Sequence, residues 1–223
     1  MSYIVREEHR RPGARGPLPA VVIGVVGAVV AVLAGLLVWS ATAEDPERPQ
    51  VSWAVVGSQP VPLSQRHGPF RTGDGLASGF SHDELGAALA ATHISARLVP
   101  TVPAAVYQAT ARAQCYGADG AGDGAVAAYV EWLARSVRGR PAASPAEVGR
   151  ELYYRVVDGD PRGGEVQISL AAVTDEARGQ GGYAELRRTL RWVDGDWKMQ
   201  LPPPPRAIVD SLSGYLPLEP DHG

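Results

Sequence analysis

Residues 183–201, with the sequence YAELRRTLRWVDGDWKMQL, decide the fold class of this chain. Apolar and polar residues alternate up to Val193, and a second alternating run follows the Asp194-Gly195 pair. Alternation with period two is typical of a strand with one buried face, and Asp-Gly favours a two-residue hairpin turn. The segment therefore predicts two antiparallel strands, the first with an outward face of Glu185, Arg187, Thr189 and Arg191.

Two more strands are predicted before this hairpin. The alternation begins near residue 151, and a Gly-rich turn at residues 159–164 separates it from a second apolar series, Val166, Ile168, Leu170 and Ala172. Residues 202–205 are four consecutive prolines, which end the sheet. We therefore expect a curved antiparallel meander of about four strands, followed by a C-terminal extension over residues 203–223 that packs as a short helix.

Helical patterns come before the strands. Ser81-His82-Asp83-Glu84 matches a capping box, in which Ser81 is the N-cap and Glu84 reaches back to it. Apolar spacing predicts a helix from there to Pro100, a second from Pro103, and a third over residues 126–137. Helices followed by an antiparallel sheet predict an α+β domain over residues 81–202, with about three helices packed on one sheet face.

Residues 41–80 are predicted to form a stalk or arm. The proline and glycine density between residues 44 and 80 prevents regular helix and interrupts sheet pairing. Aromatic residues interrupt this polar segment at Trp53, Phe70 and Phe80. Such side chains either anchor the arm on its own domain or contact a partner, and both interpretations stay open.

Residues 20–39, AVVIGVVGAVVAVLAGLLVW, contain no charge and reach about 30 Å as a helix. We predict a transmembrane helix over residues 20–40 that binds the lipid bilayer. Four arginines precede it and Glu44, Asp45 and Glu47 follow, so residues 1–19 are predicted to be cytoplasmic and the domain extracytoplasmic. A cleaved signal peptide ending at residues 41–43 is the alternative. Gly27, Ala31 and Gly35 share one helix face, which permits self-association.

Composition limits the classes of function. The chain has 21 basic and 24 acidic residues, of which four Arg and two Glu precede residue 20, so the remainder carries 17 basic and 22 acidic groups and a net charge of −5. Direct nucleic-acid binding generally needs a basic patch and is not expected. Cys115 is the single cysteine, so no intrachain disulfide forms; it is either a buried apolar residue or a thiol that pairs between chains.

The sequence contains no convincing catalytic or metal motif. His82 and His93 are eleven residues apart, about 16 Å along one helix, so they cannot share an ion. Ser81, His82 and Asp83 are the residue types of a hydrolase triad, but adjacent positions point in different directions. The glycine-rich segments 73–79 and 119–124 have neither nucleotide-loop nor EF-hand spacing. We therefore predict no catalytic residue, no cofactor and no metal.

Five residues are the candidates for partner binding: Trp53, Phe70, Phe80, Arg187 and Arg191. The two arginines lie on one predicted strand face, where they either dock an acidic surface or form cross-strand ion pairs. The aromatic residues are the stronger candidates, because aromatic side chains dominate interface energetics.

The hairpin Leu190-Arg191-Trp192-Val193-Asp194-Gly195-Asp196-Trp197 resembles the last strands of the nuclear transport factor 2-like cone. Across residues 53–201, segments such as Ser78-Gly79-Phe80-Ser81-His82 and Gly181-Gly182-Tyr183 resemble an uncharacterised family of single-pass actinobacterial membrane proteins that accompany conjugative elements. The architecture is similar to that of TcpC-like and type IV secretion assembly proteins. This resemblance implies an envelope assembly role and no catalytic residues.

Together these features predict a non-enzymatic, membrane-anchored scaffold or assembly component of a conjugation-like transfer or secretion apparatus, with protein partners in the envelope. The alternative is a lipid- or small-molecule-binding accessory protein of an envelope transporter. An open apolar cavity lined by Trp192, Tyr154 and Leu89 favours the alternative, whereas a filled interior favours the scaffold. An isomerase with an inward carboxylate is a third class, but the strand pattern places no Asp or Glu inward.

Overall fold

The computed structural model describes residues 51–57, 59–118, 122–137 and 151–218. All of them belong to one compact unit, Arg48–Gly223, so part of the predicted arm and of the C-terminal extension folds with the domain. No helix within these residues combines the length and the apolar character needed to cross a bilayer. The predicted tail, residues 1–19, and the predicted transmembrane helix, residues 20–40, lie outside the described part of the chain.

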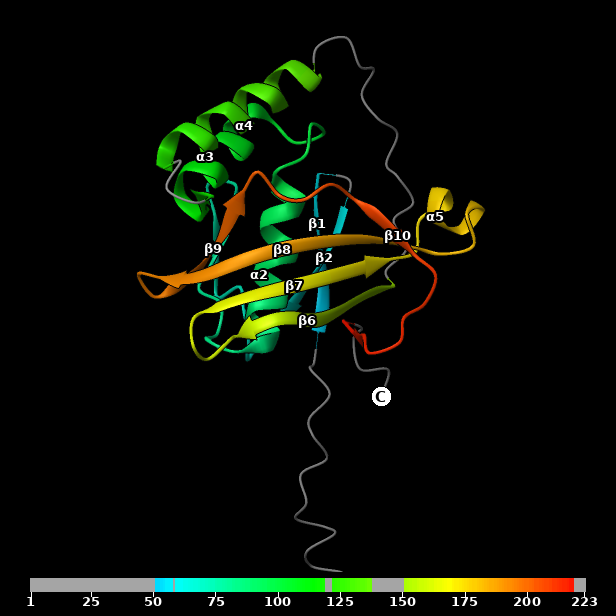
Figure 1. The fold of residues 1–223 in the computed structure, drawn as a ribbon. Helices are drawn as coiled ribbons and strands as arrows, with labels where there is room; N and C mark the ends of the chain where they lie inside the picture. The colour runs from blue at the N-terminus through cyan, green and yellow to red at the C-terminus, as the bar shows by residue number, and fades with distance from the viewer. Residues whose placement is uncertain (1–50, 58, 119–121, 138–150, 219–223) are drawn as a thin grey trace, which may run out of the picture. The chain divides into compact units, whose positions relative to one another are not determined.

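The largest sheet is built around four long strands, β6 (Leu152–Asp160), β7 (Glu165–Ala172), β8 (Tyr183–Val193) and β9 (Asp196–Leu201). Each pairs antiparallel with the next in chain order. Asp194, in the β8–β9 turn, has a φ of 54° and Gly195 a φ of 79°, as a two-residue hairpin with two left-handed positions requires. Figure 1 shows these strands lying side by side, with the helix α2 behind them.

The predicted fold class, about three helices on a four-stranded antiparallel sheet, is wrong, because in the described residues this sheet has seven strands and is mixed. The short strand β5 (Cys115–Gly117) pairs parallel with β9, while β10 (Ala207–Val209) pairs with β8 and β11 (Leu216–Pro217) pairs with β6. Two or three residues are too few to show a period of two. The C-terminal segment that was expected as a short helix therefore supplies two strands instead.

Four helices are described, one more than expected: α2 (Glu84–Arg97), α3 (Ala104–Gln114), α4 (Gly122–Val137) and α5 (Asp175–Gly179). Helix α2 is buried on nearly every side, because it packs between the large sheet and strands β2 and β4. Because its alanine side chains are small, the large sheet on one side and strands β2 and β4 on the other approach the helix closely. Leu89 and Ile94 are completely buried between them. The core of the domain therefore surrounds α2.

The predicted capping box is wrong by two residues. Asp83, not Ser81, is the N-cap of α2, and its side chain accepts a hydrogen bond from the Gly86 amide at 2.8 Å. The Ser81 hydroxyl donates to the Asp83 carboxylate at 2.8 Å. A carboxylate also interacts favourably with the positive end of the helix dipole, which explains why Asp83 takes this position.

Two hairpins lie within the residues predicted as an irregular arm: β1 (Val51–Val56) with β2 (Gln59–Ser64), and β3 (Arg71–Gly73) with β4 (Leu76–Ser78). Pro60 and Pro62 are two residues apart, so both lack an N–H toward the same edge of β2 and leave its pairing with β1 intact. The Pro62 carbonyl instead accepts a hydrogen bond from His93 of α2 at 2.7 Å. Proline density alone therefore did not exclude strands.

Candidate ligand pocket

A gap along one edge of β8 creates the site. On this edge β9 pairs with residues 190–193 of β8 and β10 pairs with residues 183–185, so residues 186–189 have no strand beside them. The connecting chain contains the four prolines Pro202 to Pro205, which have no N–H to donate to β8. The prolines therefore divert the chain away from the sheet and leave space next to the middle of β8.

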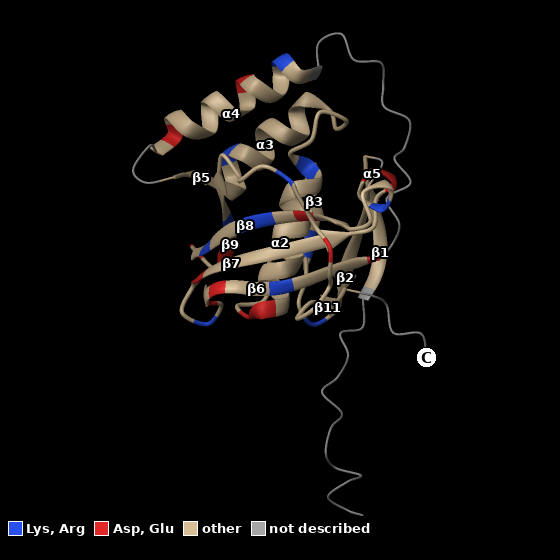
Figure 2. Cartoon of the chain, turned by 45° about the vertical axis from the view of Figure 1, so that its right-hand side comes forward, with Lys and Arg blue, Asp and Glu red and all other residues tan. Residues whose placement is uncertain are grey.

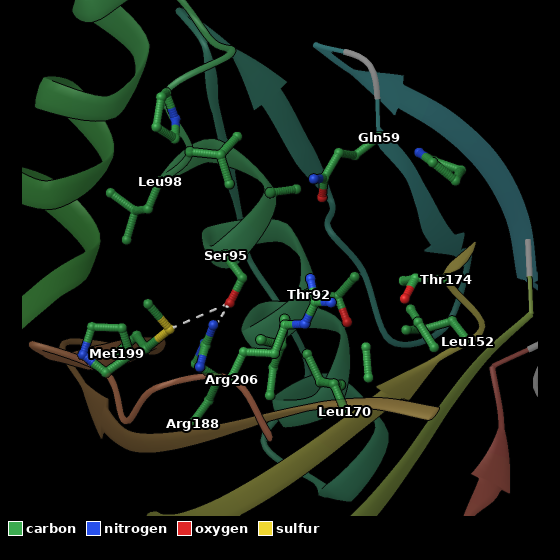
Figure 3. A pocket seen from close by; sticks show the side chains of 18 of the residues that line it. Gln59, Thr92, Ser95, Leu98, Leu152, Leu170, Thr174, Arg188, Met199 and Arg206 are labelled. Carbon is green, nitrogen blue, oxygen red and sulfur yellow. Dashed lines mark hydrogen bonds between the residues drawn. The ribbon is translucent and has the colours of Figure 1, made fainter. Parts of the chain in front are cut away.

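Two adjoining cavities occupy this space, with volumes of about 590 Å³ and about 640 Å³. The first lies among the C-terminal half of α2, the large sheet and α4, and the second lies between α4 and the proline segment. Their lining is mostly apolar, and Leu186, Trp132 and Tyr129 line both. A space of this size matches the pockets that hold drug-sized ligands. Figure 3 shows that both α2 and β8 contribute side chains to the lining.

Arg188 is the polar centre of the pocket. It lies on β8 opposite Ile168 of β7, lines both cavities and is only 8% exposed. Its Nε donates to the Ser95 hydroxyl of α2 at 2.8 Å, and the Ser95 hydroxyl in turn lies 3.8 Å from the Met199 sulfur (Figure 3). Its Nη1 donates at 2.7 Å to the Arg187 carbonyl, a backbone group at the unpaired edge. Burial lowers the pKa of Arg188 to about 10, so it stays charged at neutral pH.

Arg188 has no acidic partner within the described residues, whereas the other charged groups of the first cavity are paired. Asp175 forms an ion pair with Arg178 at 3.2 Å, and Glu176 forms one with Arg206. These pairs belong to α5 and the proline segment, at the rim of the cavity. The pocket therefore combines apolar walls with one buried and uncompensated positive charge, a costly arrangement in the absence of an anion.

Helix α4, which lines both cavities, carries few charges, as Figure 2 shows. The Trp132 side chain of α4 is 50% exposed and lies against Tyr129, with ring centroids 5.3 Å apart. The two aromatic rings form the outer wall of the pocket, between its interior and solvent. An apolar molecule entering from this side would cover them.

The pocket is not where the sequence placed it. Leu89 and Tyr154 belong to the filled core, and Trp192 stacks on His82 with ring centroids 4.2 Å apart. None of the three lines either cavity. Residues from the predicted α2, β8 and β9 segments line it instead, because the opening depends on where the chain leaves the sheet edge after β9.

The structure separates the three aromatic candidates for partner binding. Phe80 is 2% exposed and packs beside His93 in the core, so it is no part of the surface. Trp53 is half-buried in β1, opposite Pro62 of β2. Phe70 is 57% exposed. Of the three, Phe70 alone therefore presents most of its ring to solvent.

The two arginine candidates lie on the outer face of β8, as expected. Arg187 donates to Glu185 at 3.2 Å, and Arg191 donates to Glu165 at 3.4 Å while its guanidinium lies 4.9 Å from the centre of the Tyr116 ring. Arg191 therefore makes the cross-strand ion pair of the simpler interpretation, whereas Arg187 pairs with a residue of its own strand. Their role in partner binding stays a prediction.

Glu185 is buried although it lies on the outer face of β8, because Tyr215 covers it. Its carboxylate accepts hydrogen bonds from Ser169 at 2.7 Å and Tyr215 at 3.0 Å, and Arg155 lies 3.5 Å away. Burial opposes ionisation, but the hydrogen bonds from Ser169, Tyr215 and Arg187 outweigh it and lower the pKa of Glu185. This cluster attaches the C-terminal segment to the sheet.

Ser81 and Asp83 lie together with His67, whereas the triad considered from the sequence combined them with His82. His67, which was not considered, lies with its Nδ1 3.0 Å from the Asp83 carboxylate and 3.1 Å from the Ser81 hydroxyl. The Ser81 hydroxyl donates to the Asp83 carboxylate, which also accepts the Gly86 amide of the first turn of α2. Burial raises the pKa of Asp83, but hydrogen bonds from Gly86, Ser81 and His67 lower it overall. The cluster supports the start of α2.

Within the described segments, no group of three or more His, Cys, Asp or Glu side chains is close enough to hold a metal ion. Cys115 is buried in the core, and burial raises its pKa to about 12. The pocket residues themselves carry one sequence signal that was overlooked. Arg188 falls among the inward positions of β8, between Leu186 and Leu190, where an apolar residue is normal.

Residues 31–217 match the family model described as Domain of unknown function (DUF8175). The chain belongs to this family. The match covers all four long strands and helices α2 to α5, so the pocket lies within the family domain. No curated protein and no solved structure matches the chain.

Proposed function

We propose that this domain binds an apolar small molecule in the pocket between α2, β8 and α4, as an accessory protein of an envelope transporter. The observation that carries the proposal is the apolar cavity of about 590 Å³ beside the unpaired edge of β8. Most of the domain is otherwise tightly packed around α2. A space this large costs packing contacts, which a bound molecule would restore.

The proposal includes a cellular location. The uncharged run over residues 20–40 acts as a membrane anchor, and the arginines before it keep residues 1–19 in the cytoplasm. The pocket then lies on the extracytoplasmic side of a bilayer that holds apolar molecules. Protease treatment of intact cells should degrade the domain, and recovery of the full chain from the cytosol would contradict this location.

The binding proposal is tested by identifying what the chain carries. The full chain is extracted from its native membrane with a polymer that retains lipid, and the co-purified small molecules are measured by mass spectrometry. Leu186→Trp fills the pocket and should remove the bound molecule, because Leu186 lines both cavities. Thr189→Trp is the matched control, since it adds the same ring on the other face of β8. Equal recovery from both variants would contradict the proposal.

The scaffold is the second candidate function, and the exposed ring of Phe70 favours it. In this alternative the domain assembles with itself or with envelope proteins of a transfer or secretion apparatus. Crosslinking in native cells should give defined products that Phe70→Ser removes without lowering the thermal stability of the chain. A lone monomer in those cells would contradict the scaffold and leave the binding proposal standing.

A further inference from the structure

We infer that the ligand is a single-charge amphipathic anion, a long apolar chain ending in a carboxylate, and that Arg188 binds its carboxylate. This inference rests on the proposed function, because it names the ligand class of the same pocket. It adds a specific recognition residue on β8 and a prediction of which molecules are rejected.

The first support is the position of the unpaired charge. Four charged residues line the first cavity, and three of them, Asp175, Glu176 and Arg206, form ion pairs. Arg188 alone has no carboxylate within ion-pair distance in the described part of the chain, and its Nη2 makes no hydrogen bond there. A carboxylate is the natural acceptor for a free guanidinium edge, because the two groups match in shape and charge.

Ser95 gives the carboxylate a second partner. Its hydroxyl accepts from Arg188 Nε and donates only to the Met199 sulfur at 3.8 Å, which is a weak acceptor. The hydroxyl hydrogen can turn to an arriving carboxylate at little cost. Arg188 Nη2 and the Ser95 hydroxyl, which the hydrogen bond from Arg188 Nε holds side by side, therefore form a two-donor site.

The number of charges favours a carboxylate over a phosphate. One guanidinium compensates one negative charge, and the other charged groups that line the cavity, Asp175, Glu176 and Arg206, add a net charge of −1. A doubly charged phosphate would leave one charge unpaired in an apolar cavity and repel the acidic rim. The remaining walls, formed by residues such as Leu98, Leu170 and Leu186, fit a hydrocarbon chain.

The test compares three probes with the same chain length: decanoate, decanol and decyl phosphate. The full chain is held in nanodiscs of zwitterionic lipid, and binding is measured by equilibrium dialysis against empty nanodiscs to subtract uptake by lipid. Decanoate should bind at least tenfold more tightly than decanol and decyl phosphate, since a hydrogen-bonded charge pair supports such a preference. Affinity should rise about fourfold for each added methylene until the cavity is full.

Two substitutions test which residue causes the preference for decanoate. Arg188→Gln should weaken decanoate binding ten- to hundredfold and change decanol binding by less than about threefold. Arg187→Gln is the matched control, because Arg187 is the adjacent arginine on the outer face, and it should leave both affinities unchanged. Decanoate labelled with ¹³C at its carboxyl should stay ionised to lower pH in the wild-type complex than in water, a shift that Arg188→Gln removes.

The outcomes separate the two proposals. Equal binding of decanoate and decanol to the wild-type chain overturns the carboxylate inference and leaves the pocket function intact. A preference for decyl phosphate overturns it in favour of a phosphate headgroup. If no probe binds and Leu186→Trp changes nothing, the proposed function itself fails. Should Arg188→Gln not fold, the wild-type probe ranking and the ¹³C titration still decide the inference.

Discussion

Arg97 and Arg188 are two buried arginines, 6% and 8% exposed, that use their charge differently. Arg97, in the last turn of α2, donates to the Gly75 carbonyl at 2.9 Å and to the ring and carbonyl of His93 at 3.1 and 3.0 Å. Arg188 makes two hydrogen bonds and faces a cavity.

The comparison shows that burial alone does not identify a binding residue. Arg97 joins α2 to the β3–β4 turn at Gly75, and its position near a helix C-terminus favours a positive charge. Neither arginine has a carboxylate partner in the described residues, and each keeps Nη2 without a hydrogen bond there. Arg188 lines both cavities described above and Arg97 lines neither, so in this pocket the charge of Arg188 is the one a ligand can reach.

Among the substitutions that test this comparison, the largest change in stability is expected at Arg97. Arg97→Met leaves the Gly75 carbonyl and the His93 ring without their donor, so the free energy of unfolding should fall by about 4 kcal/mol. Guanidinium unfolding of the full chain, followed by tryptophan fluorescence, measures it, because Trp197 is completely buried. A loss below about 1 kcal/mol would remove the structural role assigned to Arg97.

The next effect concerns the partner of Arg97. Burial lowers the pKa of His93 to about 4, with Arg97 acting in the same direction, although the bond to Pro62 raises it. The folded state therefore binds fewer protons than the unfolded state between pH 6.5 and pH 4, so stability falls as pH falls through this range. The loss reaches about 3 kcal/mol at pH 4.

His93→Gln should flatten this pH dependence, since an amide does not titrate and can keep the hydrogen bond to Pro62. Unfolding curves of both chains at pH 7, 5.5 and 4 give the comparison. Parallel curves for the two chains would contradict a neutral buried His93.

An opposite sign is expected at Arg188. Arg188→Met removes a charge that is buried without an anion and replaces it with an apolar side chain of similar length, so the ligand-free chain should gain about 1 kcal/mol of stability. The same unfolding assay, after removal of bound lipid, measures the gain. A loss of stability as large as that of Arg97→Met would contradict the comparison, because it would show that both arginines have a structural role.

The smallest effect is expected at Ser95. Ser95→Ala removes the hydroxyl that accepts from Arg188 Nε, and the guanidinium keeps only its bond to the Arg187 carbonyl. Stability should fall by about 0.5 to 1 kcal/mol, and the effect should disappear in the Arg188→Met background if the two side chains act as a pair. A double-mutant cycle gives this coupling. Additive losses would show that Ser95 does not position Arg188.

Much of the fold was predictable because its long elements follow regular periods. Of the four long strands and the three longer helices, all but β9 have eight or more residues, which is long enough to show a period. Strand β9 is shorter, but the Asp194-Gly195 turn marks its start. The short strands β5, β10 and β11 were missed because tertiary pairing, not local pattern, places them. The hairpins before α2 were missed because the spacing of Pro60 and Pro62 matters more than their number.

The pocket was less predictable than the fold. Its residues come from α2, α4, β8 and the proline segment, and no local pattern brings these together. Arg188 is a visible exception in the inward series of β8, between Leu186 and Leu190, but this signal was overlooked. For Phe80 the sequence left open whether the ring anchors the arm on its own domain or contacts a partner, and the structure places it in the core before α2.

The parallel pairing of β5 with β9 has a consequence for how the chain matures. Cys115 is aligned with Met199, and β11 near the end of the domain pairs with β6. A polypeptide delivered amino end first, from a ribosome or through an export channel, therefore waits for its last segments before α2 acquires a complete shell. Until then the apolar residues around α2 stay partly exposed, and partly folded chains with exposed apolar surface are prone to aggregate.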